Sequence, residues 1–279
     1  MDSVPVSLSQ FARPESRPKI FTITGEGGVG KTSLACLFPN PVVIRIEDGV
    51  TTAMDNVICS PVITSSDQLF ECINALATEE HDRKTVIFDS ITQANILFES
   101  EVIASDKERA PASINQALGG YGAGHGAVSE IHRRLREWAG KLSTVKNMHV
   151  VFIAHAEGEQ VDLPDADPYM RYTLRLNKKS VSHYTDNVDC VAFVKLSRVL
   201  KTGTKKDGPK KALGDGSRII TCHSAPAQVS KNRFGIKVDL PFTENVNPFA
   251  EYLKIDKTGV ISYDPQYDYI DPSLQTLNP

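Results

Sequence analysis

The most informative residues of this 279-residue chain are Gly25-Glu26-Gly27-Gly28-Val29-Gly30-Lys31-Thr32. They fit the pattern G-x-x-x-x-G-K-[ST], in which glycines let the backbone curl around a phosphate group. The apolar, β-branched run 20–24 before them predicts a strand, and residues 33–38 after them predict the first turns of a helix. A strand, a glycine-rich loop and a helix in this order predict a phosphate-binding loop for a nucleoside triphosphate.

Each position of this loop has an expected role. The backbone N–H groups of positions 25–30 and of Ser33 are expected to point at the phosphates. Lys31 is expected to reach the β- and γ-phosphates, and the Thr32 hydroxyl to bind Mg²⁺. The alternative is a glycine-rich surface turn, which the flanking strand and helix disfavour. The sequence therefore predicts ATP and Mg²⁺ as cofactors.

Composition narrows the class of protein. The formal net charge of −3 argues against a uniformly basic nucleic-acid binder, so any DNA contact needs a local basic patch. The cysteines are scattered and lack a C-x-x-C pair, which favours free thiols over disulfides or zinc ligands. No apolar stretch approaches the length of a membrane span. We therefore expect a soluble cytoplasmic protein without a membrane partner.

The order of patterns along the chain predicts an α/β fold. Apolar runs predict buried strands at 41–48, 85–90 and 149–154. Amphipathic patterns predict helices at 67–78, at 92–105 and after a glycine-rich loop at 118–126. Strands that alternate with helices predict a mostly parallel twisted sheet with helices on both faces.

The sequence changes character beyond residue 185. Short strands are expected near 188–196, 217–222 and 235–241, and they predict an antiparallel C-terminal extension of the sheet. The expected division of the chain is an N-terminal arm at 1–18, a core at 19–250 and an acidic tail at 251–279.

Polar side chains follow three of the expected strands. Open α/β sheets bind ligands at the carboxyl ends of their strands, so these groups should meet the phosphate-binding loop. Asp89 fits a carboxylate that holds Mg²⁺ through its water shell, or else a helix N-cap, which Ser90 could equally be. Glu47 is the expected general base for the attacking water, and Asp48 is its competitor. His155 could sense the γ-phosphate or could be a structural histidine.

Two basic segments stand out in this acidic protein. Residues 201–211 are rich in lysine and form either a merely solvated loop or an electrostatic footprint for phosphates. Lys231 and Arg233 precede an expected strand. They could enter the nucleotide site of a neighbouring subunit and neutralise transition-state charge, or they could form a plain basic turn.

Together these residues resemble the RecA-like branch of P-loop NTPases over roughly residues 18–245. Glu47 looks like the catalytic glutamate of that branch, and residues 86–90 (VIFDS) are similar to its Walker B strand. His155 stands where the family has a polar γ-phosphate sensor, usually glutamine, so it departs from the pattern. Residues 231–235 (KNRFG) closely match a motif of RadA-type branch-migration proteins, whose Lys and Arg act across a subunit interface.

The bare core, the glycine-rich segment and the Ala-His-Ala strand end look most like phage nucleotide-binding proteins of the Sak type, which act in single-strand annealing and recombination. The resemblance implies a homo-oligomer, ring or filament, with ATP at its subunit interfaces. It implies that a loop at 157–179, after the sensor strand, and the glycine loop at 119–126 face single-stranded DNA. It also implies an ATPase that single-stranded DNA stimulates and that promotes annealing or strand pairing.

Two other functions stay open on the sequence. One is a ring-forming helicase or translocase motor, which would unwind DNA as a closed hexamer. The other is a non-hydrolysing switch that uses ATP to order its loops, and turnover unaffected by Glu47→Gln would indicate either this switch or Asp48 as the base. A single-strand-binding protein is a further partner that the acidic tail could contact.

Overall fold

A computed structural model of the chain describes residues 17–49, 52–197, 199–200, 212–213 and 216–254, together with residues 7, 8 and 11. Within it, Pro18–Leu253 forms one compact unit. Three expectations fall wholly or mostly outside the described residues: the N-terminal arm, the lysine-rich segment 201–211 and the acidic tail.

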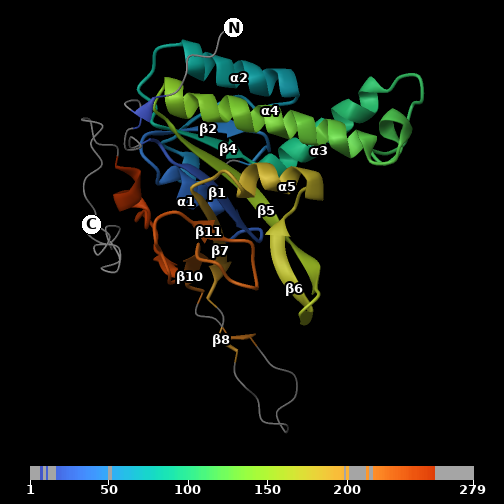
Figure 1. The fold of residues 1–279 in the computed structure, drawn as a ribbon. Coiled ribbons are helices and arrows are strands. Elements are labelled where there is room, and N and C mark those ends of the chain that lie inside the picture. Colours follow the sequence, from blue (N-terminus) through green and yellow to red (C-terminus); the bar gives the residue numbers. More distant parts are fainter. Residues whose placement is uncertain are drawn as a thin grey trace. The chain divides into compact units, whose positions relative to one another are not determined.

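A mixed sheet runs through this unit (Figure 1), with strand order β12-β10-β7-β1-β5-β4-β2-β3. The members that pair in parallel are β1 (Ile20–Gly25), β2 (Pro41–Arg45), β3 (Ile58–Cys59), β4 (Thr85–Asp89), β5 (His149–Leu163) and β7 (Cys190–Leu196). β10 (Arg218–Thr221) runs antiparallel to β7, and β12 (Leu240–Phe242) runs antiparallel to β10. The mostly parallel sheet with an antiparallel extension is therefore confirmed.

Helices cover both faces of the sheet. One face carries α2 (Ser66–Thr78), α3 (Ile91–Ser105), α4 (Ala123–Val145) and α5 (Lys178–Thr185). The other carries α1 (Lys31–Cys36) and the 3-10 helix η4 (Ala250–Leu253). Because successive strand residues point to opposite faces, Val86 and Phe88 of β4 join the first core while Ile87 joins the second.

The remaining elements lie outside the strand order and the helices given above. They are η2 (Thr52–Met54), η3 (Ala117–Gly119), β6 (Ala166–Leu174), β8 (Val199–Leu200), β9 (Ala212–Leu213) and β11 (Lys231–Asn232). β6 pairs with β5, β11 pairs with β7, and β8 with β9 forms a separate two-stranded sheet.

The strand expected at 188–196 is wrongly assigned to the antiparallel extension. It is β7, and it lies parallel to β1 with Phe21 beside Cys190 and Gly25 beside Val194. Parallel pairing requires a connection that carries the chain back across the sheet, and α5 belongs to that connection. The strand expected near 235–241 is limited to Leu240–Phe242.

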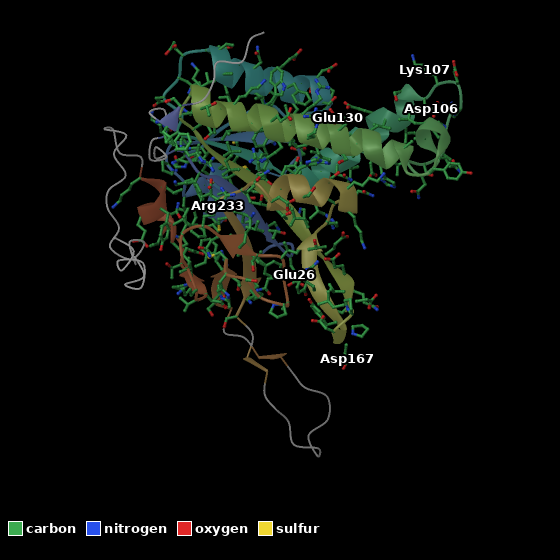
Figure 2. All side chains as sticks on the ribbon, viewed as in Figure 1. Glu26, Asp106, Lys107, Glu130, Asp167 and Arg233 are labelled. Carbon is green, nitrogen blue, oxygen red and sulfur yellow. The ribbon has the colours of Figure 1, made fainter. Side chains whose placement is uncertain are left out.

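The loop expected at 157–179 is also wrong, because most of it is a β-hairpin. β5 continues past His155 to Leu163 and returns as β6, with Ala156 opposite Leu174. A Pro-Asp pair at 164–165 supplies the turn. The hairpin extends away from the helices (Figure 1), and Asp167 lies near its tip (Figure 2).

Three smaller findings complete the description. Helix α4 begins at Ala123, so the expected glycine-rich loop 118–126 ends earlier than the sequence suggested. All five cysteines are free thiols. None of the described helices is both long enough and apolar enough to span a membrane.

Candidate nucleotide site

The glycine-rich loop joins the carboxyl end of β1 to α1. Gly28 and Gly30 have positive φ angles of 74° and 91°, which glycine adopts without steric cost. A Cβ added at Gly25 would lie 2.3 Å from the backbone oxygen of Val194 on the neighbouring strand β7. The sheet therefore requires glycine where the loop begins, and the loop has the backbone freedom of a phosphate cradle.

Lys31 lies over this loop. Its Nζ donates hydrogen bonds to the carbonyl oxygens of Gly25 at 3.1 Å and of Glu26 at 2.7 Å. Burial lowers the pKa of Lys31, and the nearby charges of Asp89 and Glu47 act in the opposite direction. The ammonium is thus held where both carboxylates and the loop meet.

Thr32 and Asp89 form the next pair. The Thr32 hydroxyl donates to Asp89 Oδ2 at 2.8 Å, and Asp89 is buried at the end of β4. Burial raises the pKa of Asp89, while the Thr32 hydrogen bond and Lys31 oppose that rise. Ser90 is the N-cap of α3, since its hydroxyl accepts from the Gln93 N–H at 3.3 Å. The N-cap alternative for Asp89 therefore does not apply.

A Mg²⁺ ion fits this pair of oxygens. A hydroxyl and a carboxylate side by side, next to a phosphate-binding loop, are the hard oxygen ligands that Mg²⁺ prefers. No group of three or more His, Cys, Asp or Glu side chains in the described part of the chain could hold a metal ion alone. The remaining ligands of an ion at Thr32 and Asp89 must then be phosphate oxygens and water.

Glu47 faces the same place from the end of β2. The Ser90 hydroxyl donates to Glu47 Oε2 at 3.2 Å, and His155 Nε2 lies 3.8 Å from that oxygen. The neighbouring His155 side chain is the main cause that lowers the pKa of Glu47. His155 reaches this position because its residue in β5 lies directly beside Gly25 in β1. An ionised carboxylate with a histidine beside it is an arrangement that can accept a proton from water.

Asp48 points elsewhere. Its Oδ1 accepts an ion-paired hydrogen bond from Arg45 at 2.9 Å, and 83% of its side chain is exposed. The two candidate bases are thereby separated, with Glu47 toward His155 and Asp48 toward Arg45.

A cavity of about 460 Å³ adjoins α1. Its lining includes Ser33, Cys36, Leu37, Thr52, Ala53, Asn56, Arg218, Phe242, Glu244 and Asn245. The Arg218 guanidinium lies over the Phe242 ring at 5.5 Å from its centroid. A Cβ at Gly30 would meet Arg218 Nη1 at 2.7 Å and Phe242 Cε1 at 3.1 Å, so both side chains pack against the loop. Sequence reasoning missed them because no motif marks them, and only the pairing of β10 with β7 and β12 brings them here.

Lys231 and Arg233 lie at the amino ends of β1 and β7, whereas the phosphate-binding loop follows the carboxyl end of β1. Figure 2 labels Arg233 of the first group and Glu26 of the loop. The Arg233 N–H donates to the Asp189 carbonyl at 2.9 Å, and its guanidinium is 3.5 Å from Asp189 Oδ1. Asp189 Oδ2 in turn accepts from the Ile20 N–H at 2.8 Å, at the amino end of β1. Gly25 is at the carboxyl end of that strand, roughly 16 Å away at ~3.3 Å per residue. The structure therefore does not bring this pair to the loop of its own chain.

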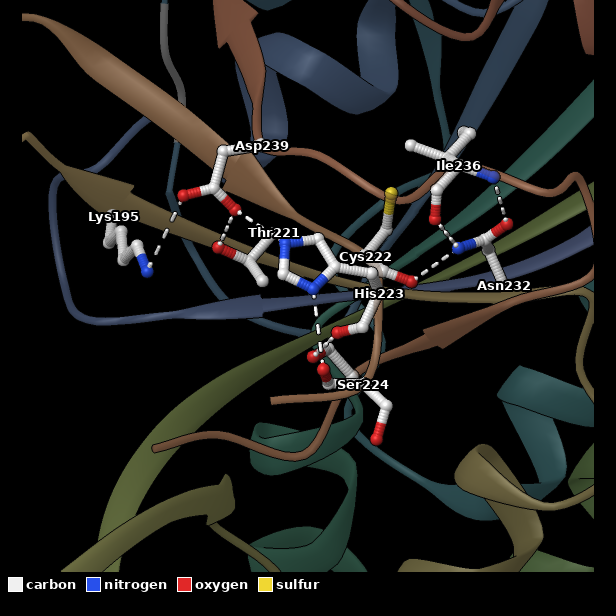
Figure 3. A network of polar contacts seen from close by, with 9 residues as sticks. Lys195, Thr221, Cys222, His223, Ser224, Asn232, Ile236 and Asp239 are labelled. Carbon is white, nitrogen blue, oxygen red and sulfur yellow. Dashed lines mark hydrogen bonds and ion pairs between the residues drawn. The ribbon is translucent and has the colours of Figure 1, made fainter. Parts of the chain in front are cut away.

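The turn that carries Arg233 is held by Asn232 (Figure 3). The Asn232 amide donates to the carbonyls of Cys222 at 2.7 Å and Ile236 at 2.9 Å. Its oxygen accepts from the N–H groups of Phe234 at 2.9 Å and Ile236 at 3.0 Å. Lys231 Nζ also donates to the Asp186 carbonyl, and burial is the main cause that lowers its pKa. Asn232, the second residue of the KNRFG motif, thus fixes the turn, and Arg233 projects from it with 51% of its side chain exposed.

Comparison with known proteins agrees with this geometry. The family described as AAA domain matches residues 17–234, a range that contains every site residue expected from the sequence. No curated protein matches the chain. The matched range covers most of the chain and encloses a phosphate-binding loop on an α/β sheet. The chain therefore belongs to the AAA domain family, and its core is a P-loop ATPase-type domain.

Proposed function

We propose that this protein is a Mg²⁺-ATP-dependent DNA recombination ATPase, which binds single-stranded DNA and promotes annealing or strand pairing. It acts as an oligomer with ATP at its subunit interfaces. The observation that carries the proposal is the convergence of Lys31, the Thr32–Asp89 pair and the Glu47–His155 pair at one edge of the sheet. That edge is where open α/β sheets bind ligands.

The positions of these groups support a mechanism for ATP hydrolysis. The water oxygen bonds to the γ-phosphorus while the bond to the β–γ bridging oxygen breaks, and Glu47 accepts the proton of the water. Lys31 stabilises the negative charge that moves onto the departing ADP. Thr32 and Asp89 would hold a Mg²⁺ ion, whose positive charge would help to stabilise the charge that develops on the phosphates. His155, next to Glu47, keeps that carboxylate ionised.

The cavity beside α1 suits the nucleoside part of ATP. Its volume of about 460 Å³ is in the usual range for small-molecule sites. The Arg218 guanidinium, which lies 5.5 Å from the centroid of the Phe242 ring, offers a planar group on which a base can stack.

The charges favour a narrower DNA-facing surface than the whole of 157–179. The β5–β6 hairpin repels phosphates because it carries many carboxylates: Glu157, Glu159, Asp162, Asp165 and Asp167. Lys178 and Lys179 begin α5, and Lys179 Nζ donates to the Gly122 carbonyl at 3.0 Å. Tyr121, next to Gly122, is fully exposed and has a φ of 50°. An exposed aromatic ring close to lysines provides base stacking together with phosphate attraction.

Lys231 and Arg233 support the oligomeric part of the proposal. They lie far from the loop of their own chain, so they can act on ATP only in a neighbouring subunit. Asn232 holds their turn rigid, which suits a finger that must reach a fixed point across an interface.

The test is ATP hydrolysis with and without single-stranded DNA, in wild type, Lys31→Ala and Arg233→Ala. We expect DNA to stimulate the wild type, and Lys31→Ala to lose about 10²–10³ in turnover. Arg233→Ala should lose about 10³-fold or more but keep its affinity for ATP. Arg133→Ala is the matched control, because it removes an arginine from the exposed side of α4 and should change turnover by less than about twofold.

Mixed oligomers separate the cis and trans roles. A subunit with Arg233→Ala keeps its own loop, and a subunit with Lys31→Ala keeps its finger. Mixing the two inactive proteins should therefore restore part of the activity. If mixing restores nothing, Arg233 does not act across an interface.

The remaining outcomes decide between functions. Turnover that ignores DNA, or protein that stays monomeric with ATP and DNA, contradicts the recombination proposal. Unwinding by a closed hexamer indicates a helicase-type motor, and ATP binding without turnover indicates a switch. Tyr121→Ala should weaken single-stranded DNA binding by about 5- to 100-fold. The same variant should leave hydrolysis in the absence of DNA unchanged.

A further inference from the structure

Arg175 is a basic residue at the root of the β5–β6 hairpin. The last pair of the hairpin ladder is Ala156 with Leu174, and one step further the Arg175 N–H donates to the His155 carbonyl at 2.8 Å. The Leu176 N–H donates to the Leu174 carbonyl at 2.8 Å, which closes a tight turn around Arg175. The backbone of Arg175 is therefore fixed against the residue that contacts Glu47.

This backbone position directs the Arg175 side chain. Residues that face each other across an antiparallel pair have their side chains on the same face, with Cβ atoms about 4.5–5.5 Å apart. The His155 side chain is on the face where its Nε2 lies 3.8 Å from Glu47 Oε2. Arg175 thus leaves the backbone on the side of Glu47 and Lys31.

The charges around Lys31 agree with this placement. Burial is the main cause that lowers the pKa of Lys31, and the positive charge of Arg175 lowers it further. Two cations are close enough to influence each other beside the phosphate-binding loop. Among the residues that the structure describes, no carboxylate forms an ion pair with Arg175. Arg175 therefore adds positive charge beside Lys31 that no carboxylate pairs with in the described part of the chain. An anionic ligand between Arg175 and Lys31 would be attracted by both charges.

We propose that Arg175 binds the γ-phosphate of the ATP held by its own chain. This inference rests on the proposed ATPase function and adds a catalytic residue to it. A planar guanidinium can donate two parallel hydrogen bonds to phosphate oxygens. In hydrolysis the transferred phosphoryl group spreads charge over its equatorial oxygens, and Arg175 stabilises that charge in cis. Arg233 then remains the contribution of the neighbouring subunit.

The experiment compares the affinities for Mg²⁺-ADP and for a non-hydrolysable Mg²⁺-ATP analogue in wild type, Arg175→Ala and Arg175→Lys. Arg175→Ala should lower the affinity for the analogue by about 10- to 100-fold, because hydrogen bonds to a charged partner are lost. The affinity for ADP, which has no γ-phosphate, should stay within about twofold of wild type. Arg175→Lys keeps the positive charge but loses the planar guanidinium. Its affinity for the analogue should lie between those of wild type and Arg175→Ala.

Arg171→Ala is the matched control. Arg171 lies on the same hairpin, but its guanidinium is paired with Glu159 at 2.6 Å. Its removal should leave the ratio of analogue to ADP affinity unchanged. If Arg171→Ala lowers the ratio as much as Arg175→Ala, the hairpin as a whole is responsible and the inference is wrong.

Other results distinguish a failure of the Arg175 inference from a failure of the proposed ATPase function on which it rests. If the wild type binds neither nucleotide, the ATPase proposal itself fails, and the role of Arg175 fails with it. If the wild type binds both nucleotides, and Arg175→Ala lowers both affinities equally or lowers neither, only the role of Arg175 is overturned. If Arg175→Ala lowers only the affinity for single-stranded DNA, Arg175 is a DNA contact and the inference is overturned.

Discussion

Glu47→Gln is the substitution that tests the chemistry of the site most directly. The carboxylate accepts from Ser90 at 3.2 Å and lies 3.8 Å from His155, and its pKa lies below the usual 4.5. Glutamine has nearly the same shape, and its oxygen can still accept the Ser90 hydrogen bond. The fold should therefore survive while the ability to take a proton from water is lost.

The magnitude follows from the role. Removing a general base costs about 10²–10⁴ in rate, which corresponds to about 3–5 kcal/mol in the barrier. ATP affinity should not fall, because the change removes a negative charge from the surroundings of the phosphates. The assay is single-turnover hydrolysis measured beside ATP binding on the same protein.

Asp48→Asn is the control. Asp48 is exposed and pairs with Arg45, and such surface pairs contribute only about 0–1 kcal/mol. Turnover in this variant should stay close to that of the wild type. If Asp48→Asn loses a hundredfold while Glu47→Gln keeps most of its turnover, the assignment of the base is wrong. The pH profile gives a second check, because a base with a lowered pKa remains ionised as the pH falls from 8 to 5, so the rate should not decline on its account.

The remaining predictions concern binding and stability. Gly25→Ala should destabilise the fold by about 1–3 kcal/mol or more in urea unfolding, because its Cβ would meet backbone at 2.3 Å. Gly27→Ala, where nothing lies within 4 Å, should change stability far less, and equal losses would contradict the close approach to β7. Arg218→Ala should raise the KM for ATP by about tenfold with kcat little changed, since it removes a stacking surface for the base. Burial lowers the pKa of His132 to about 3, so the folded state resists protonation that the unfolded chain accepts below ~6.5. Between pH 7 and 5 this group should therefore cost about 2 kcal/mol of stability, and His132→Gln should remove that part of the pH dependence.

The sequence predicted the parts of the site that depend on local chemistry. The loop at 25–32, with a strand before it and a helix after it, is recognisable because all its determinants are neighbours in the chain. Asp89 and Glu47 follow buried strands, and the carboxyl ends of parallel strands meet at one edge of the sheet. Their proximity to Lys31 was therefore predictable without knowledge of the strand order.

Other features depend on pairing between distant segments, which periodicity does not reveal. The sequence predicts a loop in place of the hairpin because the hairpin strands are exposed and polar, and a solvated strand lacks the alternation that marks a half-buried one. The sequence predicts an antiparallel β7 because α5 is too short to give a clear helical pattern before it. Arg218 and Phe242 reach the loop only through the order of β12, β10 and β7.

The position of Arg233 separates the groups needed for ATP binding from those needed for full turnover. On the proposed function, ATP binding needs only groups of one chain: the loop, Lys31, the Thr32–Asp89 pair and, on our inference, Arg175. All of these belong to the carboxyl edge of the sheet, so a single subunit can hold ATP. Arg233 is fixed to Asp189 at the amino edge, and no side-chain rotation spans the length of β1 between the two ends. Nucleotide binding and full turnover should therefore have different requirements, the first satisfied by a monomer and the second only by an assembly that brings the amino edge of one subunit to the loop of the next.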